Sequence, residues 1–507
     1  MFWVAVLVAA ALLALNLGAL GAVIWRADTG AHLEAADWAA ARFTVVQALL
    51  SSVISVALAI PVARALNRRR FFGRKVLIIL MGAPFILPVL VAVIGLLAVF
   101  GRSGLFNDLI ALVGFPPFSI YGLHGVVLAH VFFNLPLSVR LLLQGWARVP
   151  AEHLRLAATL GFGGWARFRH IEMAMLLRVV PGALAVVFLI CMTSFAVALT
   201  LGGGPRATTL ELAIYQAFRF DFNLARAALL ALMQAAIGIV ALVLLARVTL
   251  PDGAVSGFDR LAPTPPGGFA KLVDGLYIAL AALFLIAPLA MVVARGLPHV
   301  ASLPAPVWLA LLQSLKVAAL SVLLLAGMTA GLAFAALQRR WPEGVGMAAL
   351  MSSPLVIGTG AFIVIHPFAD PANWALAVTA LVNAAMALPF ALRAVLPAAR
   401  RAEADFARLS AALGLSWPAH LRLVLLPRVR RPMGFALGLG AALSLGDLGV
   451  IVLFAQTGGE TLPMMVQRLM GAYRSDDAAG AALVLLVVAL AGFVVLERLI
   501  GGKDADT

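Results

Sequence analysis

The chain has 507 residues, of which 63% are hydrophobic and only 12% are charged. A soluble globular chain would have about a quarter of its residues charged, so the composition excludes that class and indicates a polytopic membrane protein. The formal net charge of +15 does not indicate binding to nucleic acid, because the Lys and Arg residues lie in short loops between apolar segments.

In chain order, the apolar segments predict an all-α protein with about twelve membrane-spanning helices, since a bilayer core requires about 20 apolar residues per helix. The first segment could also be a cleaved signal peptide, but it lacks a basic start and is long enough to span. The predicted spans are 3–25, 41–66, 76–100, 122–144, 179–201, 224–247, 272–295, 309–337, 345–367, 374–396, 431–455 and 478–499.

The distribution of cations predicts which side of the membrane each loop faces. If the N-terminus is cytoplasmic, 27 of the 37 Lys and Arg residues lie in cytoplasmic segments and 9 in outer segments. Cytoplasmic loops of membrane proteins carry such an excess of cations. The sequence therefore predicts that both termini are cytoplasmic.

A polar, Arg-rich segment from Arg148 to Pro181 separates two of the apolar spans. Ala151 to Leu160 consists of good helix formers, and Gly161 with the glycines that follow allows a sharp turn. A second helical stretch, Trp165 to Leu177, comes next. We predict a helix–turn–helix element over residues 148–178, on the cytoplasmic surface.

The same element recurs 253 residues later. Arg408–Gly414 repeats Arg155–Gly161 with five of seven residues identical. The same offset relates Leu135-Pro136 to Leu388-Pro389, Arg140 to Arg393, Arg169 to Arg422 and Thr208 to Thr461. We therefore predict two parallel half-repeats, residues 1–249 and 272–507, joined by a cytoplasmic linker at 250–271, with the second element at 400–430.

The sequence offers no catalytic or metal-binding motif. Its one Gly-Lys pair, Gly502-Lys503, lacks the frame of a phosphate-binding loop. The single cysteine, Cys191, lies in an apolar span, and no His/Cys cluster has the spacing of metal ligands. We expect no cofactor or metal in this chain and no hydrolysis of ATP by it.

The two polar elements carry large apolar side chains beside cations, which a solvated loop would not need but a docking helix would. We predict that they bind a partner. The candidate docking residues are Arg155, Leu160, Gly161, Phe162, Trp165, Arg408, Leu413, Gly414, Leu415 and Trp417.

These elements resemble the coupling loop of ABC importer permeases, whose pattern is E-A-A, three residues, Gly, nine residues, I-x-L-P. After nine intervening residues, Gly414 is followed by Val424-Leu-Leu-Pro427 and Gly161 by Ile171-Glu-Met-Ala174. Both copies have Arg where that family usually has Glu, which leaves the usual charge pairing with the ATPase open.

The resemblance extends over nearly the whole chain, to the fused two-half permease of bacterial thiamine ABC importers. The stretches that carry it are Arg64–Phe71, Leu128–Pro136, Leu201–Ala217, Ser444–Val450 and Tyr473–Asp477.

This resemblance implies a type I ABC importer permease fold in the bacterial inner membrane. It implies import of thiamine, and of its phosphate esters, from a periplasmic thiamine-binding protein, driven by two copies of an ATPase subunit that bind ATP and Mg. A permease for ferric ion or another small solute is the nearest alternative. A twelve-span secondary transporter is the other, although it would be expected to carry more ionisable residues inside its spans.

Asp447 is the one acidic residue inside a predicted span and away from its ends. An ionised carboxylate there costs roughly 2.5–3.5 kcal/mol, so we expect Asp447 to face the bundle interior. It could balance a cationic substrate, and a structural or gating role is equally compatible with the sequence. We include Asp447, Ser444, Ser194 and Thr193 as candidates for the substrate pathway or gate.

Overall fold

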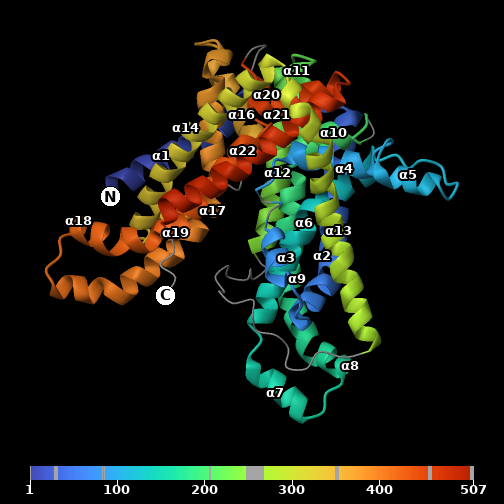
Figure 1. Cartoon of the computed structure of the whole chain (residues 1–507). Coiled ribbons are helices and arrows are strands. Elements are labelled where there is room, and N and C mark those ends of the chain that lie inside the picture. Colours follow the sequence, from blue (N-terminus) through green and yellow to red (C-terminus); the bar gives the residue numbers. More distant parts are fainter. Residues whose placement is uncertain are drawn as a thin grey trace.

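The computed structural model describes residues 2–27, 32–82, 84, 86–204, 207–246, 268–348, 353–454 and 459–502, and in this part every regular element is a helix (Figure 1). The first half contains α1 (Phe2–Ala27), α2 (Ala35–Arg68), α3 (Arg74–Leu80), α4 (Val89–Phe100), α5 (Leu105–Ala111), α6 (Leu123–Ala147), α7 (Ala151–Thr159), α8 (Gly164–Arg167), η2 (Phe168–Glu172), α9 (Met173–Met192), α10 (Phe195–Leu201), α11 (Leu210–Arg219) and α12 (Leu224–Ala246). The second half contains α13 (Phe269–Gly296), η4 (Leu297–Ser302), α14 (Ala305–Ala335), α15 (Trp341–Ala348), α16 (Pro354–Ile365), α17 (Pro371–Ala412), α18 (Trp417–His420), η6 (Leu421–Leu425), α19 (Leu426–Gly446), α20 (Ile451–Phe454), α21 (Leu462–Gly471) and α22 (Ser475–Gly501). Most of the predicted linker, residues 250–267, lies outside the described residues.

Among the described helices, ten are long and apolar enough to cross a membrane, and each overlaps one of the twelve predicted spans. The predicted all-α polytopic fold is therefore confirmed. The other two predicted spans do not form single long helices. Residues 345–367 belong to α15 and the short α16, and residues 431–455 are divided between α19 and α20.

Two further predicted spans are also interrupted. Residues 76–100 are divided between α3 and α4, and 179–201 between α9 and α10. Prolines explain the first break, because Pro84 and Pro88 lie between α3 and α4 and cannot donate a backbone hydrogen bond. The prediction of continuous helices was wrong at these positions. Each half thus contributes interrupted helices at corresponding places.

The first long helix of each half packs against the other half. Helix α1 lies against α16, and α13 lies against α4, as Figure 1 shows at opposite edges of the bundle. Glycines permit both crossings. A Cβ at Gly95 would overlap the carbonyl oxygen of Pro288, and a Cβ at Gly360 would overlap the carbonyl oxygen of Ala19. Each half therefore packs its first long helix against the other half.

Local geometry supports the correspondence between the halves. Each polar element contains a π-helical turn, η2 in the first half and η6 in the second, at the predicted offset of 253 residues. The match of Thr208 with Thr461 is off by one, since Thr209 and Thr461 occupy the N-cap positions of α11 and α21. Polar hydroxyls secure both helices: Thr44 accepts a hydrogen bond from the Leu210 amide at 2.8 Å, and Ser314 from the Leu462 amide at 2.7 Å.

Candidate functional site

The first polar element, residues 148–178 and here called elbow one, projects from the bundle at the foot of Figure 1. Helix α7 ends before Gly161, whose φ of +68° is a left-handed conformation that favours glycine. Helix α8 then begins, and Trp165 on it is 72% exposed. The predicted helix–turn–helix is confirmed, and its large apolar side chains face outward.

Elbow one is attached to the bundle through Glu172 in its π-helical turn. This buried carboxylate accepts hydrogen bonds from Arg64 at 2.6 Å and from Arg68 at 2.7 Å, both on α2. Charge-assisted bonds of this kind are stronger than neutral ones, and breaking a buried pair leaves an uncompensated charge. Two ion pairs thereby tie elbow one to α2.

The second polar element, residues 400–430 and here called elbow two, has the same turn but a different attachment. Gly414 has a φ of +64°, and Trp417 on α18 is half-buried. The buried His420 ring lies 2.8 Å from the Ser410 hydroxyl and 2.8 Å from the Glu403 carboxylate, which join the two arms of the elbow. In elbow two these contacts join one arm to the other, whereas in elbow one the contacts of Glu172 join the elbow to α2.

The approach to the two elbows also differs. Helix α17 runs without interruption from Pro371 to Ala412, whereas in the first half α6 ends at Ala147 and α7 starts at Ala151. The position that holds Pro150 in the first half holds Glu403 in the second. Proline disfavours helical backbone in the residue before it, which accounts for the break before elbow one. The two elbows are therefore not identical in shape.

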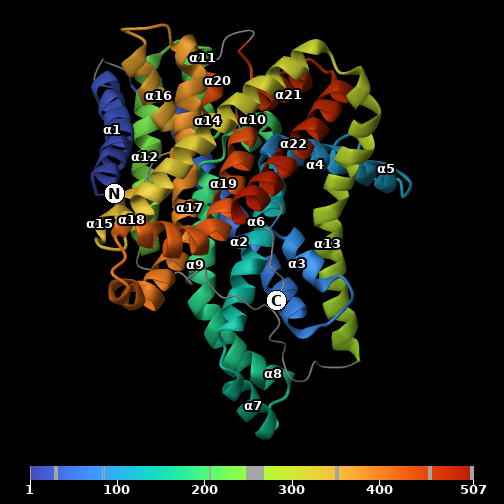
Figure 2. The same ribbon diagram turned by 60° about the vertical axis from the view of Figure 1, so that its left-hand side comes forward.

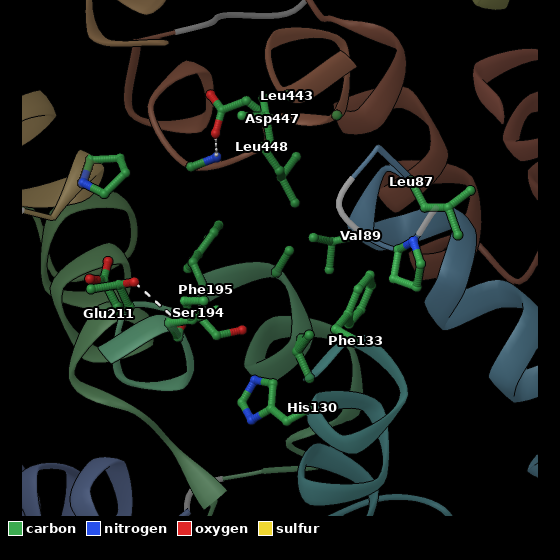
Figure 3. Close-up of a pocket in the computed structure, with 18 of the residues that line it drawn as sticks. Leu87, Val89, His130, Phe133, Ser194, Phe195, Glu211, Leu443, Asp447 and Leu448 are labelled. Atoms are coloured by element: carbon green, nitrogen blue, oxygen red, sulfur yellow. Dashed lines mark hydrogen bonds between the residues drawn. The ribbon is translucent and has the colours of Figure 1, made fainter. Parts of the chain in front are cut away.

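A cavity of about 370 Å³ lies between the two halves, where the interrupted helices meet (Figure 3). Its lining includes Pro84 between α3 and α4, Pro354 at the start of α16, and Thr193 and Ser194 between α9 and α10. Asp447, between α19 and α20, completes the set. In transporters, interrupted helices of this kind form binding sites because their free backbone groups and helix ends face a cavity and not lipid.

Two carboxylates line this central pocket from different halves, and Figure 3 shows them on different walls. Asp447 Oδ1 accepts a hydrogen bond from the Gly449 amide at 3.1 Å, whereas Oδ2 is buried without a partner among the described residues. Glu211 is buried on α11 and accepts hydrogen bonds from Ser353 and Gln234. Burial raises the pKa of Glu211 to about 8, against the opposing effect of the Ser353 hydroxyl. Asp447 therefore has an unused acceptor, while Glu211 has its hydrogen bonds supplied by the protein.

No protein-family model matches the chain. Curated relatives align with nearly all of it. The thiamine transport system permease protein ThiP of Brucella abortus (strain 2308) is 41% identical to this chain over 514 aligned residues. The alignment covers 98% of this chain and 93% of that protein. The protein of the same name from Salmonella typhimurium is 40% identical, covering 93% of this chain and 90% of that protein, and the one from Haemophilus influenzae is 34% identical, covering 92% and 88%.

The chain belongs to the family of thiamine transport permeases. The resemblance found in the sequence is confirmed, and neither a ferric-ion permease nor a secondary transporter is favoured. As a thiamine-family permease, the chain is a multi-pass membrane protein, and its relatives are permease subunits, not enzymes.

The structure brings together part of the predicted set of pathway residues. Thr193, Ser194 and Asp447 line the central pocket, as the offset of 253 residues between Ser194 and Asp447 would suggest. Ser444 does not line it, and its hydroxyl instead accepts a hydrogen bond from Asn383 at 3.2 Å. Asp447 faces the interior as expected, but from the connection after α19 and not from within a helix.

Sequence reasoning missed three polar residues that line the pocket. They are His130 and Asn134 on α6 and Glu211 on α11. Glu211 lies in a stretch predicted to be an outer loop, so nothing in the sequence indicated its burial. His130 and Asn134 share one face of their helix at a spacing of four residues, a signal that could have been used.

Proposed function

We propose that the central pocket is the passage for thiamine through this permease, and that Asp447 faces the positive charge of the substrate there. The observation that carries the proposal is the meeting of interrupted helices from both halves around an unpartnered carboxylate oxygen. Thiamine carries a fixed positive charge on its thiazolium ring. A carboxylate in a low-dielectric pocket attracts such a cation more strongly than it would in water.

The chain's own residues would perform transport by alternating access. A separate ATPase subunit would bind ATP and Mg and close with the nucleotide bound, while this chain supplies the docking surfaces and the passage. Movement of elbow one would reach α2 through Glu172 and its two arginines. Movement of elbow two would reach the pocket along α17 and α19, which carry Phe390 and Leu443 of its lining.

The two elbows support a partner complex with two copies of one ATPase subunit on the cytoplasmic side. A periplasmic thiamine-binding protein would deliver substrate to the opposite face. The distribution of cations supports cytoplasmic termini. So does the arrangement of the described chain, since Figure 2 shows the start of α1 close to α18, and Arg430 at the end of elbow two donates a hydrogen bond to the Ile500 carbonyl at 3.0 Å.

Transport of thiamine by the complete importer in vesicles tests the role of Asp447. We expect Asp447→Asn to insert normally and to lower transport about tenfold or more, the worth of a charge-assisted contact. A neutral thiamine analogue should lose much less. Asp476→Asn, at the exposed start of α22, is the matched control.

A second variant separates charge from position. Because Ser194 and Asp447 correspond and line the same cavity, the exchange Ser194→Asp with Asp447→Ser keeps one carboxylate in the pocket. It should recover part of the thiamine transport that Asp447→Ser alone loses. Equal losses for thiamine and the neutral analogue would instead assign Asp447 to gating, and undiminished transport by Asp447→Asn would remove it from the passage.

A further inference from the structure

A second cavity, of about 560 Å³, lies within elbow one and does not belong to the central pocket. The end of α6, the start of α7, the π-helical turn η2 and the first turns of α9 line it, and it is open to the surface. Its lining residues are Gly145, Arg148, Val149, Pro150, His153, His170, Ile171, Ala174, Met175, Arg178 and Val179. It therefore sits where two spanning segments emerge into the elbow.

The polar part of this elbow-one pocket is wholly basic among the described residues. Two guanidinium groups, of Arg148 and Arg178, and two imidazole rings, of His153 and His170, line it, and none of the lining residues is acidic. The side chains of Arg178 and His153 form no hydrogen bond or ion pair within the described part of the chain. The nearby Glu172 carboxylate does not neutralise the pocket, because it is already bound to Arg64 and Arg68.

Elbow two provides an internal comparison. At the offset of 253 residues, Phe406 takes the place of His153, and Arg428 takes the place of Met175. These two side chains stack, with the Arg428 guanidinium carbon 3.7 Å from the centre of the Phe406 ring. Leu423 replaces His170. In the second half, Arg428 is therefore stacked on Phe406. In the first half, the corresponding region is a cavity lined by basic side chains, including Arg178.

We propose that the elbow-one pocket binds a phosphate group. Guanidinium groups match the oxygens of phosphate in charge and geometry, and imidazole N–H groups add donors. The phosphate could be the head group of an anionic lipid, since basic pockets between spanning helices at the cytoplasmic surface recognise such groups. It could equally be a soluble phosphate ester. Bound between α7 and α9, the phosphate would link the two arms of elbow one.

Binding of two probes to the purified full-length chain tests the proposal and distinguishes the two sources. Inorganic pyrophosphate is titrated by calorimetry, and phosphatidylglycerol is followed by native mass spectrometry against a neutral glycolipid without phosphate. We expect at least one phosphate probe to bind the wild-type chain. Arg178→Gln should weaken that binding about tenfold, the loss of one charge-assisted contact. The matched Arg431→Gln, directly after elbow two, removes the same charge and should leave that binding unchanged.

A pocket-closing variant separates specific binding from general attraction of anions. His153→Phe with Met175→Arg introduces the stacked pair of elbow two and makes the elbow no less positive at neutral pH. The proposal requires that this variant lose phosphate binding. Loss of pyrophosphate binding assigns the pocket to a soluble ligand, and loss of retained phosphatidylglycerol assigns it to lipid. Absence of binding in the wild type, or equal effects of Arg178→Gln and Arg431→Gln, would overturn the proposal.

Discussion

At the scale of single residues, the two tryptophans of the elbows have different surroundings. Trp165 is 72% exposed, and the centroid of its ring lies 5.7 Å from that of Phe168. Trp417 packs partly against the core of the second half and lies 5.8 Å from His420. The sequence offers both tryptophans as docking candidates in two unequal elbows, and the structure leaves Trp165 more exposed than Trp417.

This difference leads to a prediction for the ATPase complex. Trp165→Ala should weaken retention of the ATPase by about 2 kcal/mol, roughly thirtyfold, as truncation of a buried interface tryptophan commonly does. Trp417→Ala should cost less in retention and more in the thermal stability of the isolated chain. Co-purification at fixed ATPase concentration and thermal unfolding in detergent measure the two effects. Retention of both ATPase copies by the double variant would show that the docking surface lies elsewhere.

At the scale of elements, the glycine turns decide the shape of both elbows. Gly161 and Gly414 have φ angles of +68° and +64°, and neither has an atom within 4 Å of an added Cβ. Any cost of substitution therefore comes from the backbone, about 1–2 kcal/mol for a residue other than glycine in this conformation.

We predict that Gly161→Val with Gly414→Val inserts in the membrane but transports less thiamine per ATP hydrolysed, because the strained turns misplace the docking helices. Gly164→Val is the control, since Gly164 starts α8 directly after the turn, with equal space but without a positive φ. Transport and ATP hydrolysis by the reconstituted importer are measured together. An unchanged ratio in the double variant would contradict the role given to the turns.

The close crossings of α13 with α4 and of α1 with α16 depend on another pair of glycines. A Cβ at Gly95 or Gly360 would overlap a carbonyl oxygen of the helix that crosses it, and backbone cannot yield as a flexible side chain does. Gly95→Ala and Gly360→Ala should each lower the stability by about 1–3 kcal/mol, as overpacking does. Thermal unfolding in detergent measures this, with Gly275→Ala on α13 as control, where the space is open. Equal melting temperatures for all three variants would argue against the close crossings.

At the scale of the whole molecule, hydropathy and cation distribution predict the class, and ten of the predicted spans have helical counterparts. The repeat predicts the two elbows, because Arg155–Gly161 and Arg408–Gly414 are local patterns. The breaks could not be placed by hydropathy, which averages over a window and does not register Thr193 or Asp447 within an apolar run. The central pocket could not be predicted either, since Glu211 and Pro354 meet only through tertiary packing.

The central claim is that thiamine passes through the pocket between the interrupted helices, open to one side at a time. Thr193 lines this pocket and is exposed, and Cys191 is the chain's single cysteine. A Thr193→Cys variant in a Cys191→Ala background therefore gives one reactive site. The rate of its labelling by a membrane-impermeant thiol reagent, in vesicles with the complete importer, is the most direct measurement. We predict labelling from outside only when the ATPase is trapped closed, labelling from inside only without nucleotide, and suppression of labelling by thiamine. Labelling that is independent of both nucleotide and thiamine would contradict the account.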